Sequence, residues 1–73
     1  MRIIVVGGGE VGFHITRRLV QEHQDVVLVD PNPDVIQQVS EKLDALTILG
    51  NGANPRVLSD AGLKDAEMLL AVS

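Results

Sequence analysis

The stretch that decides the fold is Arg2-Ile3-Ile4-Val5-Val6-Gly7-Gly8-Gly9-Glu10-Val11-Gly12. Its apolar run predicts a buried strand, and its glycines fill the first, third and sixth positions of a GxGxxG pattern. Gly7 permits a tight turn that a Cβ atom would block, and Gly12 lets the following helix pack closely on the strand. The stretch therefore predicts a strand, a turn and a helix in immediate succession.

The same stretch has the chemistry of a phosphate-binding loop. Gly9 lets the backbone lie against a pyrophosphate, and the free N–H groups at the start of the helix favour an anion. A second apolar run, 26–29, ends in Asp30, and an acidic residue about 20 positions after the glycines can hold ribose hydroxyls. The combination predicts a nucleotide-binding βαβ unit, and a purely structural glycine turn is the alternative.

Composition narrows the function classes. The chain has 73 residues, a net charge of −4, no cysteine and one aromatic residue, Phe13. The lack of cysteine excludes disulfides, thiolate metal sites and cysteine catalysis. An acidic chain with one aromatic ring lacks the basic stripe and stacking platform of a nucleic-acid-binding protein. No apolar run approaches the roughly 20 residues of a membrane span, so we expect a cytosolic protein.

The first helix is predicted over 10–22. Val11, Ile15 and Leu19 recur every four residues and predict its buried stripe. His14 lies off this stripe and His23 at the helix end, so both are expected on the surface. Neither has partner residues at ligand spacing, and we predict no metal site and no catalytic residue.

The rest of the chain alternates between strands and helices. Asn32-Pro33 and Asn54-Pro55 each supply an N-cap and a first-turn proline. Strands are predicted over 25–30, 45–49 and 67–72. A helix is predicted from Pro33 to about Leu43 or Asp44, and a short third helix is ended by Gly62. This alternation predicts an α/β fold with a parallel sheet and right-handed crossovers.

The expected topology is Rossmann-like, with strand order 3-2-1-4 and three helices. The switch point then lies between the first and fourth strands, where the glycine loop opens. Residues 1–73 are expected to form a single domain that corresponds to the first half of a doubly wound domain. If the chain ends at Ser73, the segment 68–72 would be an exposed apolar edge, which we expect to pair with another copy or an exchanged segment.

Several segments together resemble a known family, the TrkA N-terminal or RCK domain. They are the glycine stretch, Asp30, the loop 50–55, and the run 58–68 with its Ala61-Gly62 and Asp65-Ala66 pairs. The resemblance covers essentially the whole chain. It implies a cytoplasmic, regulatory, NAD-binding domain of a potassium uptake system. Such a domain forms homo-oligomers under a membrane transporter or channel subunit at the inner face of the cell membrane and gates it.

The resemblance also implies site residues. Gly7, Gly9 and Gly12 would form the pyrophosphate loop, lined by the backbone around Gly8; Asp30 would bind the adenosine ribose. The full set implied for the cofactor is Gly7, Gly8, Gly9, Glu10, Val11, Gly12, Asp30, Asn51 and Ser73, with Asn51 near the adenine and Ser73 facing the ribose or the phosphates. For Asp30 the alternative is a strand-end aspartate that starts the following turn, and Asn51 and Ser73 could be ordinary loop residues.

Two positions depart from the family pattern. Glu10 stands where the ATP-responsive branch often has arginine, and a carboxylate repels a triphosphate. Asn51 is frequently acidic in relatives, so adenine recognition can differ. Neither arginine nor lysine lies between Asp30 and Lys42 to offset a 2′-phosphate. We therefore expect NAD or NADH rather than NADP, ATP or ADP.

Two other functions stay open at this point. The chain could be a fragment of an NAD-dependent dehydrogenase, although hydride transfer needs a substrate pocket and an acid–base group that usually come from a further region of chain. It could also be a structural assembly module whose nucleotide site is vestigial. The same fold serves all three functions, so the fold does not decide between them. Because the chain lacks a placed acid–base group and resembles a regulatory domain, we expect that it is not an enzyme.

Overall fold

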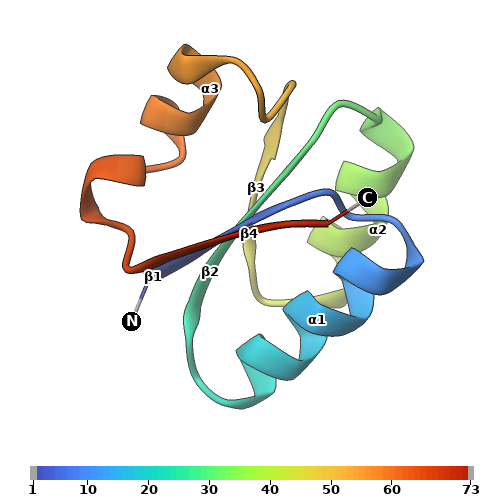
Figure 1. Ribbon diagram of the computed structural model, residues 1–73. Helices are drawn as coiled ribbons and strands as arrows, with labels where there is room; N and C mark the ends of the chain where they lie inside the picture. Colours follow the sequence, from blue (N-terminus) through green and yellow to red (C-terminus); the bar gives the residue numbers. More distant parts are fainter. Residues whose placement is uncertain (1, 73) are drawn as a thin grey trace.

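A computed structural model describes residues 2–72 and has four strands, three α-helices and one 3₁₀ helix (Figure 1). The elements are β1 (Arg2–Val6), α1 (Glu10–Gln21), β2 (Asp25–Asp30), α2 (Pro33–Lys42), β3 (Leu46–Leu49), α3 (Pro55–Asp60), η1 (Leu63–Asp65) and β4 (Met68–Ala71). All strand pairs are parallel and the order is β3-β2-β1-β4. The predicted Rossmann-like α/β fold is confirmed, with its predicted strand order.

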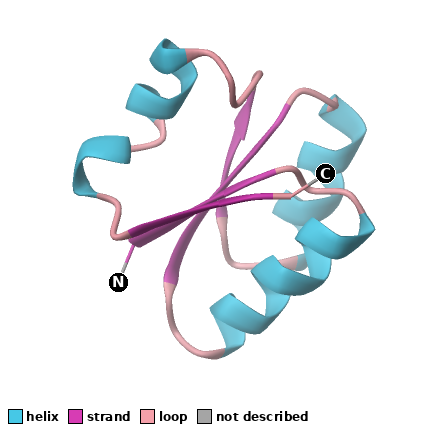
Figure 2. Cartoon of the chain, viewed as in Figure 1, coloured by secondary structure: helices cyan, strands magenta, loops and turns pink. Residues whose placement is uncertain are grey.

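The helices form a layer on each face of the sheet. Figure 1 shows α1 and α2 on one side and α3 with η1 on the other, and Figure 2 shows the strands between these layers. The arrangement follows from the right-handed crossovers, since the chain moves from β1 through β2 to β3 and then returns past β1 to β4. The direction of winding reverses between β1 and β4, which is where ligands bind in open α/β sheets.

The core is built from the central strands. Ile3, Val5, Val26 and Leu28 face α1 and α2, and Ile4, Val27 and Val29 face α3. All seven side chains are at most 2% exposed. A strand buried on both faces needs apolar residues at successive positions, which explains why β1 and β2 read as continuous apolar runs.

The contact face of α1 differs from the predicted stripe. Val11 is 57% exposed, whereas Gly12 and Thr16 are buried. Phe13, Leu19 and Val20 pack on the core beside them. The physical reason is Gly12, where the helix approaches the sheet most closely. Thr16 is four residues later and lies on the same face of the helix, so it also faces the sheet.

The ends of α2 and α3 follow the predicted capping pattern. The Asn32 side chain accepts a hydrogen bond from the Asp34 N–H (2.9 Å), and the Asn54 side chain accepts one from the Arg56 N–H (2.9 Å). A proline follows each cap at the first helical position. The 3₁₀ helix η1 was not predicted; it begins after Gly62, which has the left-handed conformation (φ 87°). Within residues 2–72, every helix is too short or too polar to span a lipid bilayer.

Candidate functional site

The glycine loop lies between the carboxyl ends of β2 and β4. The Gly7 N–H donates to the Val29 carbonyl (2.8 Å), and the Val72 N–H donates to the Val6 carbonyl (2.8 Å). Gly7 has a φ of 104°, and a Cβ atom there would collide with the Val72 carbonyl oxygen. Only glycine therefore fits the turn that takes the chain out of β1.

Gly12 of the motif and its neighbour in the loop, Gly8, are both tightly packed. A Cβ atom on Gly12 would collide with the Gly7 carbonyl oxygen, so α1 can approach the end of β1 only with glycine there. A Cβ atom on Gly8 would stand 2.7 Å from Leu28 Cδ2 and 2.7 Å from Val35 Cγ1. Gly8 is accordingly buried between the end of β2 and the first turns of α2.

Gly9 is different, because the fold itself does not require glycine there. Its φ of −66° and ψ of −161° are extended, and apart from its chain neighbours Gly8 and Glu10 no described residue has an atom within 4 Å of the Cβ position. Gly9 is also the N-cap of α1, and the structure gives this helix no side-chain cap, in contrast to α2 and α3. Open space thus stands over the first backbone N–H groups of a helix, an arrangement that suits an anionic group.

Asp30 ties the glycine loop to the end of β2. Its Oδ2 accepts a hydrogen bond from the Gly8 N–H (2.7 Å), and its Oδ1 accepts one from the Asn32 N–H (2.8 Å). The residue is only 8% exposed. The hydrogen bond to Asn32 is the contact expected of an aspartate that starts a turn, which was the alternative to ribose binding for Asp30. A carboxylate has about four acceptor positions, so these two bonds leave acceptor capacity for a ribose hydroxyl.

The loop after β3 reaches the same edge of the sheet. The Gly50 N–H donates to the Asp30 carbonyl (3.0 Å), and a Cβ atom on Gly52 would collide with Val6 Cγ1. Asn51 between them is exposed, and its Oδ1 accepts a hydrogen bond from the Ala53 N–H (2.8 Å). The fold thus brings Asn51 to the edge that holds the glycine loop and Asp30, while its side-chain oxygen shapes its own turn.

Three predicted site residues remain: Glu10, Val11 and Ser73. Glu10 and Val11 are both exposed in the first turn of α1. The exposure of Val11 removes it from the predicted core stripe and leaves it beside the open space at the helix start. Ser73 lies outside the described residues.

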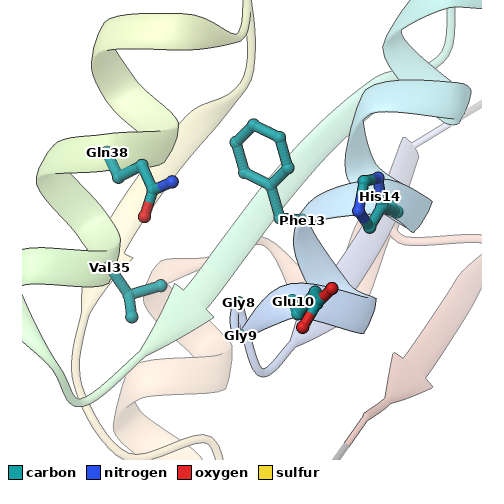
Figure 3. Close-up of a pocket in the computed structure, with 7 residues that line it drawn as sticks. All are labelled: Gly8, Gly9, Glu10, Phe13, His14, Val35 and Gln38. Atoms are coloured by element: carbon teal, nitrogen blue, oxygen red, sulfur yellow. The ribbon is translucent and has the colours of Figure 1, made fainter.

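A cavity of about 350 Å³ opens between α1 and α2 beside the glycine loop. It is lined by Gly8, Gly9, Glu10, Phe13, His14, Val35 and Gln38. Figure 3 shows the Phe13 ring between the two helices, with Gln38 on the α2 side and His14 on the α1 side. Four of the lining residues were not among the predicted site residues: Phe13, His14, Val35 and Gln38. The available signal was helical spacing, since positions 10, 13 and 14 share one face of α1, and 35 and 38 share one face of α2.

The histidines are placed as surface residues. His14 and His23 are exposed, and Arg17 Nη2 lies 3.3 Å from His14 Nδ1. His23 follows the end of α1 with a φ of 63°. In the segment 2–72, the structure has no group of three or more histidine, aspartate or glutamate side chains that could hold a metal ion.

Comparisons with known proteins give relatives that match the chain over its whole length. The Trk system potassium uptake protein TrkA of Azorhizobium caulinodans is 42% identical to the chain over all 73 residues, and that of Vibrio alginolyticus is 40% identical over the same length. The Trk system potassium uptake protein TrkA homolog of Archaeoglobus fulgidus is 44% identical over the 73 residues. In each case the whole chain aligns with 16% of the relative.

The chain therefore spans about one sixth of the length of these curated relatives. The model of the TrkA-N domain family matches residues 3–73, which include the glycine loop, Asp30 and the run from 58 to 68. The predicted resemblance is confirmed: the chain belongs to the TrkA-N domain family.

Proposed function

We propose that this chain is the nucleotide-binding part of a regulatory protein of a Trk-type potassium uptake system, and that its glycine loop binds NAD or NADH. The observation that carries the proposal is the open space over Gly9 at the uncapped start of α1. The relatives named as potassium uptake proteins support the physiological role. In this role the domain acts with a membrane potassium transporter or channel subunit.

Each part of the site has a task in this proposal. The N–H groups at the start of α1 hold the pyrophosphate, and the remaining acceptor positions of Asp30 hold the adenosine ribose. Asn51 lies at the same edge to meet the adenine. The Glu10 carboxylate stands in the first turn of α1, where it repels the extra charge of a triphosphate.

The cofactor preference rests on charge. A 2′-phosphate next to Asp30 would face a carboxylate, and the segment 31–41 supplies neither lysine nor arginine to offset the repulsion. We therefore expect NAD and NADH to bind more tightly than NADPH, ATP and ADP. Isothermal titration calorimetry of the 73-residue chain with these five ligands measures that order directly.

Gly9→Ser is the decisive variant. The serine side chain fills the open space and can accept a hydrogen bond from the helix start, so it competes with a phosphate. A serine N-cap is at least as good as glycine, so the unfolding midpoint is expected to stay the same or rise. We expect the affinity for NADH to fall at least about tenfold, equivalent to about 1.4 kcal/mol. Gln21→Ser, at the opposite end of α1, is the matched control and should bind as the wild type does.

Asp30 is a less decisive test, because its carboxylate also holds Gly8 and Asn32. If Asp30→Asn loses NADH binding, its unfolding midpoint must also be measured, to show whether the variant is still folded. Unaltered NADH affinity in Gly9→Ser, or lack of NADH binding by a folded wild-type chain, would overturn the proposed site. Turnover of the cofactor with a substrate would instead favour the dehydrogenase alternative.

The proposed mechanism of regulation is a population shift. Nucleotide binding favours one packing of the domain against its neighbours, and the difference in affinity between two arrangements is the free energy available for gating. Small-angle scattering of the full-length protein with and without NADH tests this step. Identical scattering curves at saturating NADH would exclude it.

A further inference from the structure

We propose that the Asn51-Gly52 pair, in the loop that follows β3, is a site of spontaneous covalent modification, at which the Asn51 side chain loses ammonia and becomes isoaspartate or aspartate. The modification needs neither an enzyme nor a bound nucleotide. Its effect on NADH binding rests on the proposed function, whereas the modification itself does not.

The sequence restricts this chemistry to one of the three asparagines of the chain. The asparagine side chain is attacked by the backbone nitrogen of the next residue, and proline has no N–H to give up. Asn32 and Asn54 are each followed by proline, whereas Asn51 is followed by Gly52. Glycine hinders the attack least, because it has no Cβ atom beside the attacking nitrogen. The two Asn-Pro pairs are therefore internal controls for Asn51.

Both reacting groups are accessible in the folded chain. Asn51 is exposed, and its side-chain nitrogen, which is the leaving group, makes no hydrogen bond to the described residues. Among the same residues, the Gly52 N–H donates to no acceptor. Closing a ring between these groups therefore costs no hydrogen bond at either nitrogen.

The turn that contains Asn51 also favours the attack. Asn51 Oδ1 accepts a hydrogen bond from the Ala53 N–H (2.8 Å), and the Asn51 carbonyl accepts one from the Asn54 N–H (3.0 Å). The first of these bonds folds the side chain back over the residue between its partners, Gly52. Negative charge develops on Oδ1 when Cγ is attacked, and a donor already aimed at that atom stabilises the charge.

The atoms balance with water as the one co-reactant. The Gly52 nitrogen attacks Asn51 Cγ, the bond from Cγ to Nδ2 breaks, and ammonia leaves with the Gly52 proton. Water then opens the cyclic succinimide. Attack of water at Cγ gives aspartate, and attack at the backbone carbonyl carbon gives isoaspartate, in which the main chain runs through the former side chain. The nitrogen attacks in its deprotonated form, so the rate rises with pH.

The two products affect the loop differently. Aspartate keeps the backbone length and an oxygen that can accept the same turn hydrogen bond. Isoaspartate adds a carbon to the main chain just before Gly52, which lies so close to Val6 that a Cβ atom there would collide with Val6 Cγ1. On the other side, the Gly50 N–H is held by the Asp30 carbonyl (3.0 Å). The extra carbon must therefore displace the loop at the edge of the sheet that holds Asp30.

The experiment follows the wild-type 73-residue chain over days in buffers of neutral and mildly alkaline pH. Trypsin cleaves after Lys42 and Arg56, so Asn51 and Asn54 lie in one peptide, and fragmentation mass spectrometry locates the change of NH₂ to OH. We expect the change at Asn51, faster at the higher pH, with Asn32 and Asn54 unaltered. Labelling by an isoaspartate-specific methyltransferase detects the isomer that mass alone does not distinguish.

Two controls make the result decisive. Asn51→Gln keeps an amide but places it one carbon further from the Gly52 nitrogen, so this variant should stay unmodified over the same period. The chain unfolded in urea gives the rate without the fold, and we expect the folded rate to be within about tenfold of it. The proposal is overturned if Asn51 reacts in urea but stays intact in the folded chain, if neither form reacts, or if Asn32 and Asn54 react as fast.

The effect on the proposed dinucleotide site is measured by calorimetry with NADH. The isoaspartate form, separated from the aged chain, should bind NADH several-fold more weakly than Asn51→Asp, which carries the same charge without the extra carbon. Equal affinities would overturn the predicted displacement of the loop. If the unmodified chain is folded and does not bind NADH, the proposed function fails, while the mass and methylation results still decide the modification.

Discussion

Thr16 is a buried polar residue in the middle of the contact face of α1. Its side chain is fully buried, and Oγ1 has no hydrogen-bond partner among the described residues. An unsatisfied hydroxyl in such a place costs about 1–3 kcal/mol relative to a satisfied one. The residue is therefore a weak point in an otherwise apolar interface between α1 and the sheet.

We expect Thr16→Val to stabilise the chain, because valine has nearly the same shape and lacks the unpaired hydroxyl. A gain of about 1 kcal/mol would raise the melting temperature by about 4–8 °C in a domain of this size. Thermal unfolding followed by circular dichroism measures the change. Thr16→Ser keeps the hydroxyl, loses a methyl group and should melt at a lower temperature than the wild type. A lower melting temperature for Thr16→Val would mean that the hydroxyl has a partner, such as a buried water.

At the scale of the element, the packing of α1 on β1 is set by Gly12. In an exposed helix interior, replacing glycine by alanine gains about 1 kcal/mol of helix propensity. Here the added Cβ atom would collide with the Gly7 carbonyl oxygen, and overpacking of this kind costs about 1–3 kcal/mol. The contact must also be relieved by moving α1 away from the sheet, so the packing cost is the larger effect.

Gly12→Ala is accordingly expected to lower the free energy of unfolding by about 1–2 kcal/mol, despite the better helix former. Urea denaturation gives this value from the transition midpoint. Ser40→Ala, at an exposed position in α2, is the control in which propensity acts alone, and it should be slightly stabilised. Equal stabilisation of both variants would show that α1 does not depend on close approach at Gly12.

Local signals in the sequence are enough to predict most of the elements. The bounds of β2 and the asparagine caps of α2 and α3 were predicted residue by residue, because apolar runs and Asn-Pro pairs act locally. The contact face of α1 was not predicted correctly. Val11 and Ile15 suggest an apolar stripe, but the position of Gly12 against the sheet depends on a backbone contact with Gly7, which helical spacing does not reveal. The two hydrogen bonds of Asp30 and the cavity beside Phe13 depend on how separate elements meet, which spacing within one element does not reveal.

At the scale of the whole molecule, β4 is an edge strand with apolar exposure. Within the described residues it pairs only with β1, and Met68 and Leu69 are 45% and 40% exposed. An unpaired edge with apolar side chains is a template for another strand. It therefore supports our expectation that this chain associates with another copy or accepts an exchanged segment.

We expect light scattering of the 73-residue chain to show association that increases with concentration. Leu69→Lys places a charge on the edge strand and should shift the chain toward the monomer, because charged edges resist pairing. Glu67→Gln changes the net charge by the same amount just before the strand, so it should leave the association unchanged. A monomer at every concentration would contradict this expectation.

The position of β1 also affects how the protein forms during synthesis. β1 pairs with β2 on one side and with β4 on the other, where Ile3 is aligned with Met68. During synthesis β1 thus waits for its second neighbour until the chain has reached β4, which takes on the order of several seconds at about 5–20 residues per second. During that interval one edge of this central strand is open, and an open strand edge is a template for pairing with another chain.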